Sequence, residues 1–146
     1  MKLSEHFTLE ELTFSQTAIR LGINNTPTED GIIKLGYLCN TLLEPLREAI
    51  GTPIRISSGY RSPELNKAIG GAATSRHCLY EAVDMTVPGW TVEQFYQFIK
   101  HSSLPYRQLI QEFDSWVHLS VNTRNNKGYE NLRAVKENGK TVYMKD

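Results

Sequence analysis

Hydrophobic positions recur at helical spacing between residues 26 and 51. They fall three or four residues apart, which is the pattern of a long helix with one buried face. Pro45 lies inside this run and is expected to kink or divide the helix, because proline removes a backbone donor. Gly51 is a suitable end for the helix. The buried face is predicted to consist of Ile32, Ile33, Leu35, Leu38, Cys39, Leu42, Leu43, Leu46 and Ile50.

Three shorter segments also carry helical signals. Residues 7–15 are expected to form a helix in which Thr8 caps the first turn. Pro63 suits a first helical position and predicts a helix that runs to about Ile69, where two glycines follow. The last helix is expected over residues 91–101, with a buried face made of Val92, Phe95, Phe98 and Ile99.

Short β-rich runs dominate the second half of the chain. A hairpin is expected near the end, because Asn138-Gly139 favours a tight turn between two β-rich runs. Helices come first and strands gather late, which favours an α+β fold over regular βαβ alternation. We therefore expect one domain over residues 1–146, with N-terminal helices packed on a mostly antiparallel sheet. The predicted strands are 53–57, 81–87, 108–112, 116–121, 134–136 and 141–143.

Composition and charge narrow the range of partners. Lys and Arg number 16 and Asp and Glu number 16, so the formal net charge is zero. Proteins that bind nucleic acid or anionic membranes through bulk charge need a basic excess, so we expect neither partner. The first residues lack the apolar segment of a secretory signal. We accordingly expect that the chain is made in the cytoplasm. Separately, we expect it to be a monomer.

Two histidines and an aspartate form a candidate metal site. His77 precedes Asp84 by seven positions, and His118 lies in a separate β-rich run. Two imidazoles and one carboxylate can bind zinc and leave a fourth position open for water. The other two histidines, His6 and His101, are expected to be solvated. This spacing by itself is weakly specific. The surrounding sequence is therefore needed to judge whether the three residues form a metal site.

The surrounding sequence resembles a known family in three blocks, which occur in a fixed order along the chain. They are Ile56-Ser57-Ser58-Gly59-Tyr60-Arg61-Ser62-Pro63-Glu64-Leu65-Asn66, then Gly70-Gly71-Ala72-Ala73-Thr74-Ser75-Arg76-His77 running on to Ala82-Val83-Asp84, and Trp116-Val117-His118-Leu119-Ser120. Together they resemble the zinc D-alanyl-D-alanine carboxypeptidase family, which includes bacterial cell-wall enzymes and phage endolysins. The resemblance spans residues 3–121 and implies a hedgehog/DD-peptidase-like fold.

The resemblance also implies roles for individual residues. It implies that His77, Asp84 and His118 bind one Zn²⁺ and that a peptidoglycan stem peptide is the substrate. Ser75 matches the serine of the family's Ser-x-His motif and is expected to support the loop or the substrate. Arg61 matches the arginine of the Gly-Tyr-Arg-Ser block. Its guanidinium suits a peptide carboxylate or an oxyanion, and a structural salt bridge is the alternative.

Tyr80 departs from the family pattern, which usually has glycine at this position. Glycine there indicates a backbone turn or open space near the metal. A tyrosine can narrow the pocket, rotate outward or contribute a hydroxyl to the substrate, and all three alternatives stay open. Trp116 has the same strand parity as His118, so it can line the cleft or pack in the core.

The general base is a choice between two carboxylates. Some relatives place an acidic residue three positions before the last histidine ligand, but this chain has Ser115 there. Glu112 is expected at the mouth of the loop, opposite the start of the His118 strand, so we favour it as the base. Asp114 is the reserve candidate, because its place at the loop tip also suits an ordinary turn residue.

The predicted function is hydrolysis of peptidoglycan stem peptides by a zinc peptidase. The reaction is either D-Ala-D-Ala carboxypeptidase or L-Ala-D-Glu-type endopeptidase cleavage. A phage lysin or virion-associated enzyme that acts at the cell wall is the expected setting. Two alternatives stay open: a non-catalytic module that binds cell-wall peptides, and a hydrolase or lyase for another substrate on the same scaffold.

Overall fold

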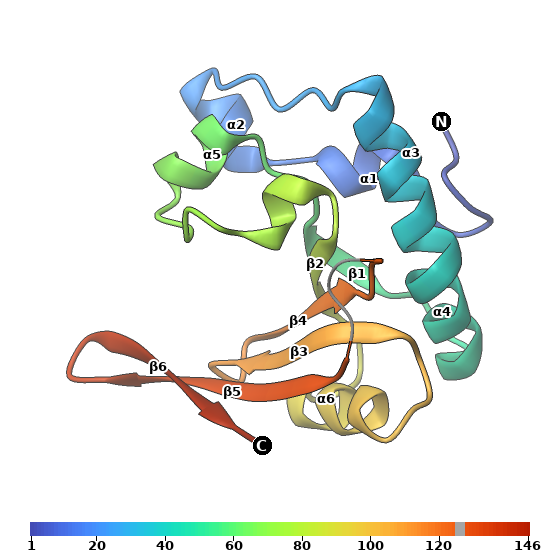
Figure 1. Ribbon diagram of the computed structural model, residues 1–146, viewed down its shortest axis with the longest axis vertical. Helices are drawn as coiled ribbons and strands as arrows, with labels where there is room; N and C mark the ends of the chain where they lie inside the picture. The colour runs from blue at the N-terminus through green and yellow to red at the C-terminus, as the bar shows by residue number, and fades with distance from the viewer. Residues whose placement is uncertain (125–127) are drawn as a thin grey trace.

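A six-stranded sheet runs through the protein in the order β1-β2-β4-β3-β5-β6 (Figure 1). The computed structural model describes residues 1–124 and 128–146. Each neighbouring pair is antiparallel except β3 and β5, which are parallel. This arrangement confirms the predicted α+β fold with a mostly antiparallel sheet. The strands are β1 (Arg55–Ser58), β2 (Ala82–Thr86), β3 (Tyr106–Glu112), β4 (Trp116–Val121), β5 (Glu130–Glu137) and β6 (Lys140–Lys145).

Side-chain caps mark the starts of most helices. Thr8 and Thr91 each form a capping box, in which the cap hydroxyl and the side chain three residues later exchange hydrogen bonds with the backbone. Ser62 caps the helix that begins at Pro63. The helices are α1 (Leu9–Thr13), α2 (Gln16–Leu21), α3 (Glu29–Leu38), the π-helical turn η1 (Cys39–Leu43), α4 (Glu44–Ile50), α5 (Pro63–Ala68), the 3₁₀ turn η2 (Arg76–Leu79) and α6 (Val92–Lys100).

The long predicted helix is divided, as Pro45 indicated. It passes from α3 into the π-helical turn η1 at Cys39, and from η1 into α4 at Glu44, one residue before Pro45. At the junction the Glu44 N–H donates to the Cys39 carbonyl, five residues back. One position of the predicted apolar face is wrong. Ile33 is 72% exposed, because the buried stripe turns away from it toward Leu35 and Leu38.

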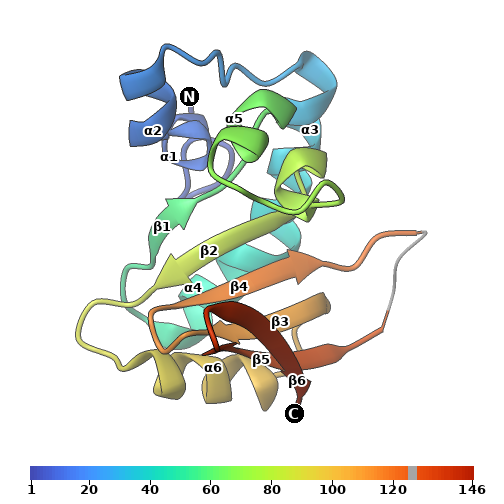
Figure 2. The same cartoon turned by 90° about the vertical axis from the view of Figure 1, so that its left-hand side faces the viewer.

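The main core lies between the helices and one face of the sheet. Leu35 and Leu42 from the long helix pack in the same cluster as Val83 of β2, Leu119 of β4 and Phe95 of α6. Figure 2 shows α4 behind the sheet and α6 along its lower edge. Alternate residues of β2 and β4 therefore face away from this core. The opposite face carries polar side chains of β2 and β4 beside a small apolar cluster made of Ile110, Leu132 and Ala134.

The short helix α2 was not predicted. Its sequence has little apolar periodicity, and Ala18 is its buried residue while Ile19 and Leu21 are exposed. Ser15 caps its first turn and Gly22 ends it in the left-handed conformation. Among the residues that the structure describes, no helix is both long enough and apolar enough to cross a bilayer.

Candidate metal centre

The candidate ligands meet on the face of the sheet opposite the helical core. Asp84 of β2 and His118 of β4 are direct partners in the antiparallel register, so their side chains point to the same side. His77 comes from the 3₁₀ turn η2, which precedes β2 in the chain and ends at Tyr80. Two neighbouring strands and one short turn thus bring together residues that are separated by up to 41 positions, 118 minus 77.

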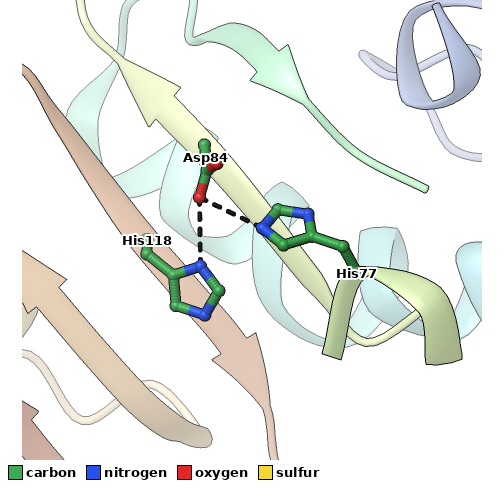
Figure 3. A group of neighbouring side chains, drawn as sticks. All are labelled: His77, Asp84 and His118. Carbon is green, nitrogen blue, oxygen red and sulfur yellow. Dashed lines mark hydrogen bonds and ion pairs between the residues drawn. The ribbon is translucent and has the colours of Figure 1, made fainter. Parts of the chain in front are cut away.

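Three ligand atoms converge in this group (Figure 3). Asp84 Oδ1 lies 3.2 Å from His77 Nε2 and 3.0 Å from His118 Nδ1. All three side chains are buried, and His77 is only 1% exposed. Burial raises the pKa of Asp84, but the neighbouring imidazoles outweigh this effect and hold the pKa well below its usual range. The centre therefore presents a buried carboxylate anion to two imidazole nitrogens.

The protonation state of His77 makes this group suited to a cation. His77 Nδ1 lies 2.8 Å from the carbonyl oxygen of Gly59, which can only accept, so Nδ1 carries the proton. Burial lowers the pKa of His77, which keeps its ring neutral and leaves a lone pair on Nε2. Among the described residues, buried Nε2 has no hydrogen-bond partner. Two electron-pair donors, Nε2 and Asp84 Oδ1, therefore face each other, and a shared metal ion would satisfy both.

Arg61 lies beside the centre and contacts the other oxygen of Asp84. Its Nη2 is 3.9 Å from Asp84 Oδ2, and its Nη1 donates to Asn66 Oδ1 over 3.1 Å. A Cβ on Gly71 would lie 2.1 Å from this Asn66 oxygen and 3.0 Å from Arg61 Nη1. A side chain at position 71 would therefore displace the Asn66 amide that accepts from Arg61. Arg61 thus pairs with Asp84, which is the salt bridge expected as the alternative to substrate binding, and it also lines the cleft.

A cleft of about 890 Å³ opens over the three ligands. Glu112, at the end of β3, lines this cleft and is paired with Trp116 of β4. Burial and the nearby Asp84 charge raise the pKa of Glu112, while His118 and Arg61 act in the opposite direction. A carboxylate with a raised pKa is suited to accept and return a proton near neutral pH. The predicted site residues that line the cleft are Arg61, Ser75, His77, Asp84, Glu112, Trp116 and His118.

Asp114 is turned away from the cleft. It lies in the β3–β4 turn with a positive φ of 56°, and its N–H donates to Gln111 Oε1. Its Oδ1 accepts a hydrogen bond from Gln111 Nε2 over 2.8 Å. Gln111 in turn donates to Glu93 of α6, on the helical side of the sheet. The structure does not bring Asp114 together with the metal ligands, whereas it does bring Glu112 there.

Tyr80 takes the outward orientation among its three alternatives. Its backbone is left-handed, with a φ of 64°, at the position where the resemblance implies glycine. Its ring stacks on Tyr60 with a centroid distance of 4.1 Å, and its hydroxyl accepts from the N–H of Thr28. Tyr80 is not among the residues that line the cleft. The structure therefore does not bring it together with the other predicted substrate-binding residues.

Ser75 and Trp116 lie at the cleft in different roles. Ser75 Oγ accepts a hydrogen bond from the His77 N–H and caps the 3₁₀ turn, so it shapes the backbone that carries a ligand. Trp116 lines the cleft and meets Phe113 edge to face at 5.7 Å. Of the two roles expected for Ser75, the structure shows support of the loop. Of the two expected for Trp116, it shows a place in the cleft lining.

Several residues of the C-terminal hairpin also line the cleft and were not predicted as site residues. They lie on alternate positions of β5 and β6, so strand periodicity indicates that they share a face. No motif marks them, however, and only the pairing of β5 with β3 places that face beside Glu112. The hairpin residues that line the cleft are Glu130, Leu132, Lys136, Thr141 and Tyr143.

Comparison with known proteins agrees with this geometry. The sequence model of the family described as Peptidase M15 matches residues 5–120, which include all three candidate ligands, Arg61 and Glu112. Among curated proteins, none matches the chain significantly. The match covers well over half of the chain. The chain therefore belongs to the Peptidase M15 family, whose peptidases are zinc-dependent and act on peptidoglycan.

Proposed function

We propose that this protein is a zinc-dependent peptidase that hydrolyses peptidoglycan stem peptides. The reaction is D-Ala-D-Ala carboxypeptidase or L-Ala-D-Glu-type endopeptidase cleavage. The observation that carries the proposal is the convergence of Asp84 Oδ1, His77 Nε2 and His118 Nδ1 at the base of a cleft that also contains Glu112. Membership of the Peptidase M15 family supports the same chemistry.

The three side chains would hold one Zn²⁺ and leave a further position open. When bound, the ion supplies positive charge that polarises the scissile carbonyl and lowers the pKa of water. The Gly59 carbonyl fixes the ring of His77 so that Nε2 points to the centre. The Arg61 guanidinium lies 3.9 Å from Asp84 Oδ2, while Oδ1 is directed at the two imidazoles.

Glu112 is the proposed general base and then the general acid. Its carboxylate accepts a proton from the attacking water and returns it to the amine that leaves. The raised pKa of Glu112, caused first by burial and then by the Asp84 charge, suits this two-way role. Arg61 at the cleft edge would bind a substrate carboxylate or the developing oxyanion. Trp116 would form an apolar wall beside the base.

We further propose that the protein acts at the cell wall, as a monomer, in the manner of a phage lysin or virion-associated enzyme. This setting rests on the resemblance to enzymes of that kind. Two features support catalysis over the non-catalytic alternative: Tyr80 is not among the residues that line the cleft, and Glu112, whose pKa is raised by burial, is among them.

Mass spectrometry of a defined stem peptide tests the proposal. Zinc-loaded protein is expected to release one new pair of products, and a chelator is expected to abolish their release. Glu112→Gln should lower kcat by roughly 100-fold or more without reducing the zinc content, because it removes proton transfer only. Asp114→Asn is the matched control and should retain near-normal activity, because its side chain bonds Gln111 instead.

Two results would contradict these assignments. If stoichiometric zinc is bound but neither the peptide nor purified peptidoglycan is cleaved, the protein is a binding module and not an enzyme. If Asp114→Asn loses activity while Glu112→Gln keeps it, the base is the reserve candidate.

A further inference from the structure

The C-terminal hairpin forms one wall of the cleft although it lies outside the residues matched to the family. The match ends at residue 120, and β5 begins at Glu130. The parallel pairing of β5 with β3 places the hairpin next to the strand that carries Glu112. In Figure 1, β5 and β6 extend past the end of β3 and β4 as a twisted ribbon. The role of this wall must therefore be inferred from its own residues.

The sheet register puts Tyr143 on the same row as Glu112. Glu112 is paired with Ala134 of β5, and Ala134 is paired with Tyr143 of β6. Paired residues point to one face of a sheet, so these three side chains lie side by side on the cleft face. Neighbouring strands are about 4.8 Å apart, which puts the Tyr143 backbone roughly 10 Å from that of Glu112. Both Tyr143 and Glu112 line the cleft.

Lys136 adds a positive charge on the same face. Its partner in the register is Thr141, and its Nζ donates to Thr141 Oγ1 over 2.9 Å. The ammonium also lies 5.2 Å from the ring centroid of Phe113. Within residues 1–124 and 128–146, Lys136 has no carboxylate within ion-pair distance, unlike the two arginines that line the cleft, which pair with Asp84 and Glu81. This exposed ammonium is therefore free to pair with an anionic group of a substrate.

We infer that Lys136 and Tyr143 form a carboxylate-binding subsite on the hairpin. The ammonium and the phenol hydroxyl donate to one carboxylate of the peptide substrate, on the side of the cleft that carries Glu112. Tyr143 is 55% exposed, and a phenol hydroxyl carries its proton at neutral pH, so it can donate to a carboxylate. The inference rests on the proposed function for the identity of the substrate as a stem peptide, which contains several carboxylates. It adds that the enzyme selects peptides in which one of these carboxylates is free.

Equilibrium binding separates this inference from catalysis. Zinc-loaded Glu112→Gln protein is titrated with a stem peptide and with derivatives in which each carboxylate is amidated in turn. One amidated derivative is expected to bind about tenfold more weakly than the free peptide. In this background, Lys136→Met and Tyr143→Phe should each remove most of that preference. Lys136→Arg should keep it, and Lys140→Met, at the start of β6 and not among the residues that line the cleft, should leave it unchanged.

The outcomes distinguish the subsite from the enzyme proposal. The subsite is overturned if no derivative binds more weakly than the free peptide, or if Lys136→Met and Tyr143→Phe keep the full preference. Hydrolysis by the wild-type protein is measured separately on the same peptides. If the free peptide binds more tightly than its amidated derivative but is not hydrolysed, the proposed enzyme is contradicted and the subsite is supported. If the peptide is hydrolysed but Lys136→Met and Tyr143→Phe both keep this binding preference, only the subsite is contradicted.

Discussion

Tyr80 combines an unfavourable backbone with favourable side-chain contacts. Non-glycine residues rarely adopt a positive φ, and the left-handed conformation of Tyr80 carries a cost of about 1 kcal/mol. In return its ring stacks on Tyr60 and its hydroxyl accepts from the backbone of Thr28. These contacts link the turn that carries His77 to the start of α3. The ring also lies directly against Gly31, where there is no space for a side chain.

Gly31→Ala is expected to destabilise the protein through Tyr80. An added Cβ would lie 2.1 Å from the Tyr80 ring, which cannot move without leaving Tyr60. We expect a loss of about 1–3 kcal/mol in the free energy of unfolding, measured by urea titration. In a Tyr80→Gly background the same change should instead be neutral or stabilise by up to about 1 kcal/mol, because alanine is favoured over glycine in a helix. An equal effect of Gly31→Ala in both backgrounds would contradict this coupling.

At the scale of the element, α6 shows how local chemistry and packing combine. Thr91 and Gln94 close a capping box at its start, and the buried side chains Phe95, Tyr96 and Ile99 lie on one face. Glu93, in its first turn, forms two hydrogen bonds with Arg133 of β5, at 2.7 and 2.8 Å. The helix thus both covers the core and fastens the hairpin that forms one wall of the cleft.

Thr91→Ala should weaken α6 by about 1 kcal/mol, because the N–H of Gln94 loses its hydroxyl acceptor. The free energy of unfolding from denaturant titration measures the loss. Thr91→Ser keeps the hydroxyl and is the control, with stability close to that of the wild type. A serine variant as unstable as the alanine variant would show that the methyl group, and not the cap, matters here.

At the scale of the whole molecule, one charge network connects the helical layer, the hairpin and the last residue. Arg133 contacts both Glu93 and Asp146, and Tyr96 and Lys100 donate to the same carboxylate of Asp146. Hydrogen bonds from Arg133 lower the pKa of Glu93 from its ordinary 4.5 to about 2. Hydrogen bonding, first from Tyr96, lowers the pKa of Asp146 to about 2 as well. Both carboxylates are therefore ionised in the folded protein well into the acid range.

This network makes stability depend on pH in a defined window. A carboxylate with a lowered pKa stabilises the fold above its unfolded value, about pH 4.5 for Glu93, and the contribution disappears as the pH falls through about 2. Arg133→Gln should therefore destabilise the protein most at pH 5–7 and progressively less toward pH 2. Urea unfolding at several pH values measures the difference. Lys140→Gln removes the same formal charge from the exposed start of β6 and should show no such trend. A constant difference across this range would rule out the ion pairs as its source.

Much of this protein follows from short-range signals in its sequence. Strand periodicity predicted residues 116–121, which are the bounds of β4, and Asn138-Gly139 indicated the hairpin turn in which both residues have a positive φ. Thr8 could be predicted as a cap because a cap depends only on residues within one helical turn. The spacing of ligand-type residues, with the family blocks around them, indicated the metal group before any fold was known.

Only the tertiary structure decided which of these residues share a site and which do not. Glu112 and Asp114 are two positions apart, yet the β3–β4 turn directs Asp114 to Gln111 and leaves Glu112 in the cleft. Tyr80 faces Tyr60 because α3 brings Gly31 beneath its ring. The parallel pairing of β5 with β3 placed Lys136 and Tyr143 at the cleft. Periodicity is a local property, whereas these choices depend on contacts between distant segments, which form only when the whole chain packs.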